Sequence, residues 1–225
     1  MGWKASTIII NEPTNTDHFQ LLEKLGFTSL RKIDDRPFEV VMNLEDNEVY
    51  IGTYKNNLLI CTQELPMQFF ENHETAAEST LMNLFPLSEI CSIVLHSTVN
   101  LWGYAILKEG KKIRARAGSA DDGTFIESGE PLEEEKEILS KSTLNRQGER
   151  TYLFEGDDEA MTEDQVGENF VFAVCKRYFG EELDSADELL FETHLKGYSY
   201  GKASGLKKAG QSKSSGHNKS WWKFW

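Results

Sequence analysis

The stretch "ICSIVLHSTVNLWGYAILKEGKKIRARAGSA", residues 90–120, decides the fold class of this chain. It opens with a nearly continuous apolar run, which is typical of a strand that is buried on both faces of a sheet. Two further strand-like segments follow and meet at Glu109–Gly110, a pair that favours a tight turn. The stretch therefore predicts a central strand followed by an antiparallel hairpin.

The residues before this stretch predict more strands and two helices. "WKASTIIIN", residues 3–11, reads as a strand buried on both faces, and Thr16 and Gly26 then bracket a short amphipathic helix. "FEVVMNL", "EVYIGTY" and "NLLICTQ" predict an antiparallel meander. Thr75 and Glu78 have the spacing of a capping box, which predicts the start of a second helix.

The residues after the hairpin predict one more strand and mostly helices. "TFIES" follows a tight turn at 121–123, and "PLEEEKEILSK" reads as an acid-led helix. Residues 140–160 read as irregular. Capping-box spacing recurs at Thr162 and at Ser185, the second just before "LLFETHL". The order of elements predicts an α+β fold, one domain over residues 1–200 with a largely antiparallel sheet covered by helices.

The charge of the chain is unevenly distributed. The formal net charge is −13, but residues 202–225 hold six lysines and no acid. The rest of the chain carries 18 Lys and Arg against 37 Asp and Glu, a formal charge of −19. Because nucleic-acid binding depends on cations that neutralise phosphates, we expect no nucleic-acid binding by this acidic body.

The cysteines and the lack of a membrane span or a secretory signal favour a cytoplasmic protein. Cys61, Cys91 and Cys175 lie in apolar segments, as buried reduced thiols do, and no pair has metal-ligand spacing. No run is apolar and long enough to span a membrane, and no secretory signal precedes the first strand.

No cofactor or metal site is expected, because neither a glycine-rich phosphate cradle nor a zinc motif is present. The candidate catalytic residues centre on His96, at the end of the predicted central strand, with Ser97 beside it. Ser119, Asp121 and Glu130 lie on turns that could approach it, which would supply a hydroxyl and a carboxylate. The alternative is a half-buried histidine that bonds a backbone carbonyl.

Several blocks together resemble an uncharacterised bacterial protein family, a domain of unknown function common in actinobacteria. These blocks are "MGWKASTIII", "VYIGTYKNNLLICTQE", "LHSTVNLWGYAILKEG", Gly129–Glu133 and a late Gly197–Tyr198. The resemblance covers residues 1–200 and implies a single domain with no known activity. The family pattern carries Asp-Trp in the hairpin, whereas this chain has Asn100 and Leu101 before Trp102.

The C-terminal segment has a different composition from the body. Residues 201–225 are rich in Lys, Gly and Ser, which predicts a flexible linker, and they end in "WWKFW". The five residues of this C-terminal peptide, the predicted partner-binding residues, are Trp221, Trp222, Lys223, Phe224 and Trp225. Trp is prominent in interface hot spots, so we expect the peptide to bind a protein partner.

Two other roles for the C-terminal peptide stay open: insertion at a membrane surface, or folding back on the acidic body. The leading hypothesis is a non-enzymatic intracellular protein that recruits a protein partner through this peptide. The alternative is a hydrolase-like enzyme that uses His96 with a nearby serine and carboxylate.

Overall fold

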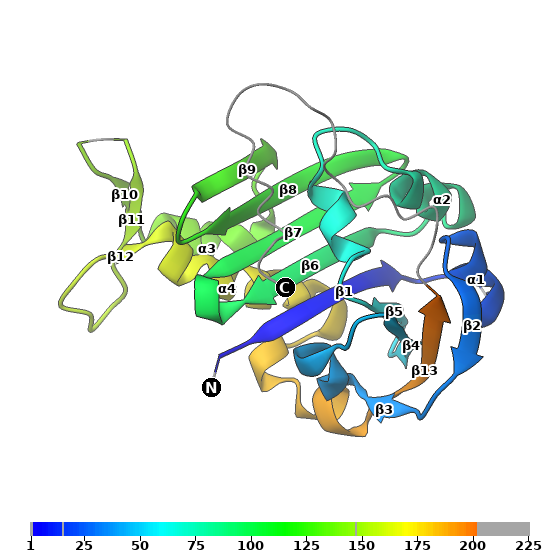
Figure 1. Cartoon of the computed structure of the whole chain (residues 1–225). Helices are drawn as coiled ribbons and strands as arrows, with labels where there is room; N and C mark the ends of the chain where they lie inside the picture. Colours follow the sequence, from blue (N-terminus) through cyan, green and yellow to red (C-terminus); the bar gives the residue numbers. More distant parts are fainter. Residues whose placement is uncertain (1, 15, 147, 202–225) are drawn as a thin grey trace.

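The computed structural model describes residues 2–14, 16–146 and 148–201. A large antiparallel sheet forms the centre of a single body, with the strand order β2-β13-β4-β5-β1-β6-β7-β8-β9 and with β3 paired to β13 (Figure 1). Its strands are β1 (Lys4–Asn11), β2 (Thr28–Lys32), β3 (Arg36–Pro37), β4 (Glu48–Tyr54), β5 (Asn57–Cys61), β6 (Ile90–His96), β7 (Leu101–Lys108), β8 (Lys111–Ser119), β9 (Gly123–Gly129) and β13 (His194–Gly201).

Helical elements cover both faces of the sheet. The helices are α1 (His18–Lys24), α2 (Ala76–Leu84), α3 (Glu133–Ser140) and α4 (Glu163–Phe179). Short helical turns are η1 (Phe38–Asn43), η2 (Pro66–Phe70), η3 (Ser97–Val99), η4 (Leu183–Ser185) and the π-helical η5 (Glu188–Glu192). A small sheet of β10 (Ser142–Leu144), β11 (Arg150–Tyr152) and β12 (Met161–Thr162) projects from one side (Figure 1).

Two apolar cores result, one on each face of the sheet. The first core lies under α4, with Trp102 of β7 stacked on Phe170 at 5.9 Å between ring centroids. The second core lies under α1, η2 and α2. In β1, Ile9 joins the first core while Ile8 and Ile10 join the second, because successive side chains of a strand point to opposite faces. This confirms the two-sided burial expected from the isoleucine run.

The central strand, the hairpin and most helix signals are confirmed. β6 lies between β1 and β7, and β7 pairs with β8 across Glu109 and Gly110, both with positive φ. Capping boxes form at Thr75 and at Thr162. The N-cap of α1, however, is Asp17 rather than Thr16, since the Asp17 carboxylate accepts the Gln20 N–H.

Three local predictions are wrong. "FEVVMNL" forms η1, because Phe38, Val40 and Val41 all turn into the first core, and this packing overrides their strand propensity. No capping box forms at Ser185, whose hydroxyl contacts Asp184, and "LLFETHL" is the short η5 followed by β13 between β2 and β4. Residues 140–160, expected to be irregular, contain β10 and β11.

Candidate functional site

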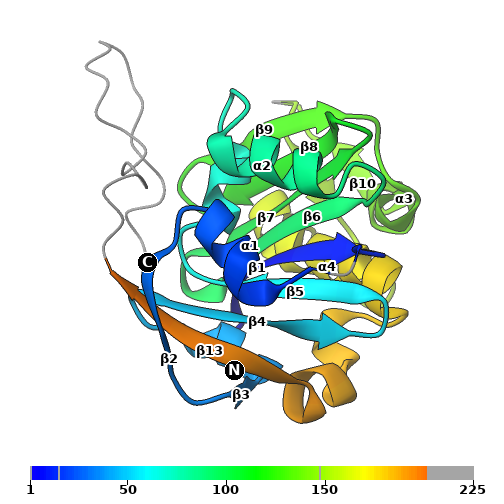
Figure 2. The same cartoon turned by 90° about the vertical axis from the view of Figure 1, so that its right-hand side faces the viewer.

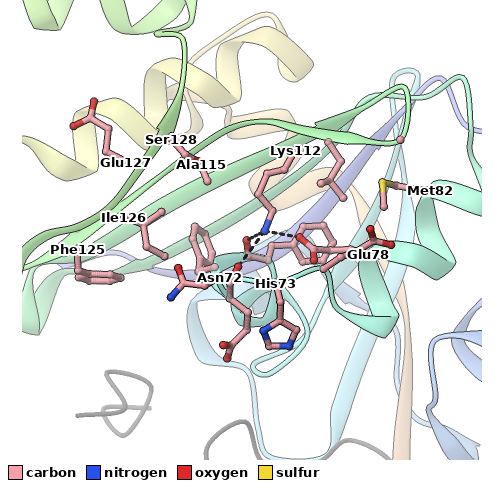
Figure 3. Close-up of a pocket in the computed structure, with 16 residues that line it drawn as sticks. Asn72, His73, Glu78, Met82, Lys112, Ala115, Phe125, Ile126, Glu127 and Ser128 are labelled. Carbon is pink, nitrogen blue, oxygen red and sulfur yellow. Dashed lines mark hydrogen bonds and ion pairs between the residues drawn. The ribbon is translucent and has the colours of Figure 1, made fainter. Parts of the chain in front are cut away.

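A groove of about 450 Å³ opens on the second-core face of the sheet, between the η2–α2 segment and strands β8 and β9 (Figure 3). Its volume lies within the range of about 300–1,000 Å³ that is usual for ligand pockets. The lining is mixed, with an apolar floor and a polar rim. It consists of Phe69, Phe70, Glu71, Asn72, His73, Glu74, Glu78, Met82, Leu107, Gly110, Lys112, Ala115, Phe125, Ile126, Glu127 and Ser128.

Two bulges give the groove its lining. In β8, Leu107 pairs with Lys112 but Ile106 pairs with Arg114, so Ile113 is an extra residue. Without this bulge Lys112 would share a face with Arg114, because alternate residues of a strand point to the same side. The extra residue turns Lys112 toward the groove and leaves Arg114 on the opposite face.

The second bulge lies in β9. Ala117 pairs with Ile126 and Gly118 pairs with Thr124, which makes Phe125 the extra residue. Both Phe125 and Ile126 therefore line the groove, and both stay partly exposed. The groove thus presents apolar side chains to solvent at the free edge of the sheet.

An ion pair lies within the groove. Lys112 Nζ is 2.7 Å from Glu78 Oε1 and donates to the carbonyl of Phe69 at 2.7 Å (Figure 3). The Glu78 side chain is 1% exposed, and its other oxygen accepts the Thr75 N–H of the α2 capping box. Lys112 therefore joins η2, α2 and β8, and its charge is matched within the groove.

The opposite face of β8 holds a buried polar cluster. Arg114 donates to Glu135 of α3 in two parallel bonds, Nε to Oε1 at 2.8 Å and Nη2 to Oε2 at 2.6 Å. Both side chains are at most 1% exposed. Arg114 also donates to the carbonyls of Ser128 and Gly129, so its guanidinium holds α3, β8 and β9 together. These contacts raise the pKa of Arg114 in spite of its burial.

Arg116 completes this cluster beneath α4. Its guanidinium contacts Glu163 and lies 4.2 Å from the ring centroid of Phe170. Tyr152 donates to the same Glu163 carboxylate at 3.0 Å. The arrangement is a buried ion pair with a cation–π contact, and it fixes the start of α4 on the sheet.

His96 and Ser97 lie at the end of β6, outside the groove lining. Burial, and then the charge of Lys4, lowers the pKa of the half-buried His96, which favours its neutral form. The Ser97 hydroxyl accepts the Trp3 N–H at 2.7 Å and lies 3.0 Å from the Trp3 carbonyl and 3.2 Å from Glu168. These contacts attach β1 and α4 to the end of β6.

The other candidate catalytic residues lie at the turns beside β9. The Ser119 hydroxyl accepts the Asp122 N–H at 3.2 Å, while Asp121 and Glu130 are exposed. Because Trp102 of β7 pairs with Gly118, the register puts Ser119 on β8 two strand spacings from His96, roughly 10 Å between backbones. Convergence of these five residues on a substrate stays a prediction.

The three cysteines are free and buried. Burial raises the pKa of the Cys61 thiol to about 12, and it also raises the pKa values of Cys91 and Cys175. These thiols are therefore unreactive packing residues. The predicted partner-binding residues Trp221–Trp225 lie outside the described residues, as does the predicted linker after Gly201.

The groove residues fall inside a segment that is shared with other proteins. A family model described as a family of unknown function, DUF6928, matches residues 18–140, which is more than half of the chain. The chain belongs to the DUF6928 family. This confirms the resemblance to a family of unknown function, over a shorter span than residues 1–200. No curated protein and no solved structure matches the chain.

The DUF6928 segment runs from α1 to the end of α3. It contains every residue that lines the groove, both bulges and the Arg114–Glu135 pair. Helix α4, strand β13 and the C-terminal peptide follow it in the chain. Among the described helices, none combines the length and apolarity needed to cross a bilayer.

The sequence alone does not reveal the groove, because the lining depends on two bulges and on contacts between distant segments. One signal was present: in "KKIRARAGS", arginines alternate with alanines on a strand that the sequence makes internal. Charged residues at alternate positions of an internal strand indicate a polar cluster on one of its faces. The same pattern left the alanines on the other face, in the second core, where Ala115 lines the groove.

Proposed function

We propose that this DUF6928 protein is a non-enzymatic binding protein that recruits a protein partner through its C-terminal peptide, Trp221–Trp225. One observation carries the proposal: composition changes abruptly after Gly201, and a basic segment without acids ends in four aromatic rings within five residues. Each such ring buries about 150–250 Å² when it docks, so four rings give enough apolar contact for micromolar binding.

The geometry of the body gives less support to the alternative, a hydrolase-like enzyme. Ser97 is held by Trp3 and Glu168, and the groove lies away from His96. The Glu168 carboxylate has a raised pKa because of burial. Ser97 therefore has neighbours that explain its position without any role in catalysis.

The setting that we propose is the bacterial cytoplasm, where three buried thiols remain reduced. The acidic body disfavours nucleic acid as the partner, and a membrane surface is the competing target of the aromatic rings. A protein partner is preferred because only six lysines, spread over 24 residues, are available to attract anionic lipid.

The test uses the full chain and a variant in which the four aromatic residues of the C-terminal peptide are replaced by serine. We expect the wild-type chain to retain a protein that the variant does not retain and that a synthetic peptide of residues 216–225 displaces. Retrieval of the same proteins by both chains would refute recruitment. Binding of the wild-type chain alone to anionic vesicles, with no displaceable protein, would replace it with membrane attachment.

A further inference from the structure

The groove has apolar side chains that nothing in the described body covers completely. Phe125 and Ile126 lie on the edge strand β9 at one end of the groove, and Met82 lies on α2 at the other end (Figure 3). All three are partly exposed, although they pack against the second core. An apolar surface of this kind, rimmed by polar residues, is typical of a docking site.

The charges around the groove favour a basic occupant. Four carboxylates line it, of which Glu78 is paired with Lys112 and Glu127 contacts the buried Arg114. This leaves Glu71 and Glu74 at the rim. The segment that precedes and includes the C-terminal peptide carries lysines and no acid, so its charge is complementary to this rim.

Side chains near the end of β13, the last described strand, point to the face of the sheet that holds the groove. Tyr198 and Tyr200, near the end of β13, pack against the second core, to which the groove residues Phe69, Phe70 and Ala115 also belong. Figure 1 draws the end of β13 and helix α2 at the same side of the molecule, and Figure 2 gives the view from that side.

The remaining chain is long enough to reach. Residues 202–220 have an expected root-mean-square span of about 25 Å for a Gly/Ser-rich linker. A body of about 200 residues has a radius of gyration of only about 16 Å. A linker of this length also gives an effective concentration of roughly 1 mM, so an intrinsic dissociation constant of about 0.1 mM would keep nine in ten peptides docked.

We infer that the groove binds the chain's own C-terminal peptide, Trp221–Trp225, when no partner is present. The inference rests on the proposed function, since it assigns to the recruiting peptide a covered resting state. A partner must then compete with the groove. At the occupancy just given, this competition weakens the apparent affinity for the partner by roughly tenfold.

The test uses the full chain with 5-fluorotryptophan in place of tryptophan, so that each of the five tryptophans gives one ¹⁹F resonance. A spin label on Ser128→Cys marks the groove rim, and a label on Glu137→Cys marks α3 on the other face. The native cysteines are buried and stay unlabelled. We expect the rim label to remove most of the intensity of the Trp221, Trp222 and Trp225 resonances, and the α3 label to leave them.

Charge reversal at the rim gives the matched control. Glu71→Lys with Glu74→Lys should restore the attenuated resonances, whereas Glu137→Lys, an exposed change on α3, should not. If the three resonances keep their intensity beside the rim label, the groove does not bind the peptide. If attenuation appears only when labelled and fluorinated chains are mixed, the occupant is a second copy, and docking within one chain is refuted.

The two proposals fail separately. Attenuation by the rim label without any displaceable partner protein would uphold docking and refute recruitment. A displaceable partner without attenuation would uphold recruitment and refute docking.

Discussion

Breaking the buried pair between Arg114 and Glu135 should be among the most destabilising single changes in this protein. Glu135→Gln keeps the shape of the side chain but removes the charge, and it puts an amide NH₂ against a guanidinium donor. Removal of one partner from a buried ion pair typically lowers the free energy of unfolding by about 3–5 kcal/mol, because the other charge stays buried without compensation. Glu135 also accepts the Leu132 N–H at the start of α3, and that bond is weakened too.

The expected loss lies at the lower end of this range, at about 3 kcal/mol. Arg114 keeps its bonds to the carbonyls of Ser128 and Gly129, at 3.3 and 2.9 Å, and its contact with Glu127 at 3.3 Å. For a chain of this length, the loss corresponds to a decrease in melting temperature of about 6–12 °C.

Urea unfolding monitored by far-UV circular dichroism measures this change. Glu137→Gln is the matched control, since it makes the same substitution at an exposed position of α3 and should change the free energy of unfolding by less than about 0.5 kcal/mol. Arg114→Met combined with Glu135→Leu should recover most of the loss, because neither charge of this pair is then buried. A loss below about 1 kcal/mol for Glu135→Gln would refute the view that this pair is desolvated.

Three further expectations follow from packing and protonation. Gly167→Ala would place a Cβ 2.0 Å from Cδ1 of Trp102, so the free energy of unfolding should fall by about 1–3 kcal/mol or more. The near-UV circular dichroism of Trp102 should also change. Lys176→Ala, an exposed change on the same helix, should alter neither quantity. Because the pKa of His96 is lowered in the folded state, the stability that its neutral form contributes is fully present above the unfolded pKa of about 6.5 and is lost as the pH falls below that value. In urea unfolding, the free energy of unfolding of the wild type should therefore decline more steeply in acid than that of His96→Gln. An equal decline would contradict the lowered pKa. A thiol reagent should modify none of the three cysteines in the folded protein and all of them in urea, and fast modification of the folded protein would contradict their burial.

The sequence determined most of the fold through local signals. The hairpin after β6 rests on Glu109–Gly110, and the starts of α2 and α4 rest on capping boxes that use residues three apart. Such interactions can be recognised in sequence because both partners are close in the chain. The same holds for the two-sided burial of β1, which an uninterrupted apolar run reveals.

The parts that could not be predicted depend on contacts between distant segments. β13 pairs with β2, which lies about 170 residues earlier in the chain, and its Ser199 pairs with Arg31. Lys112 faces Glu78 only because Ile113 forms a bulge, and nothing in "KKIRARA" marks which residue is the extra one. Strand propensity reports how well a side chain fits a half-buried surface, and η1 shows that a buried helical turn can satisfy the same residues.

The bulge at Ile113 also determines which change of length the start of β8 can tolerate. Because Ile113 is the extra residue, its deletion would restore regular pairing and would keep Lys112 on the groove face and Arg114 on the opposite face. In DUF6928 relatives we therefore expect that the segment between the tight turn and the first buried arginine can be one residue shorter without turning the basic residue away from the α2 glutamate.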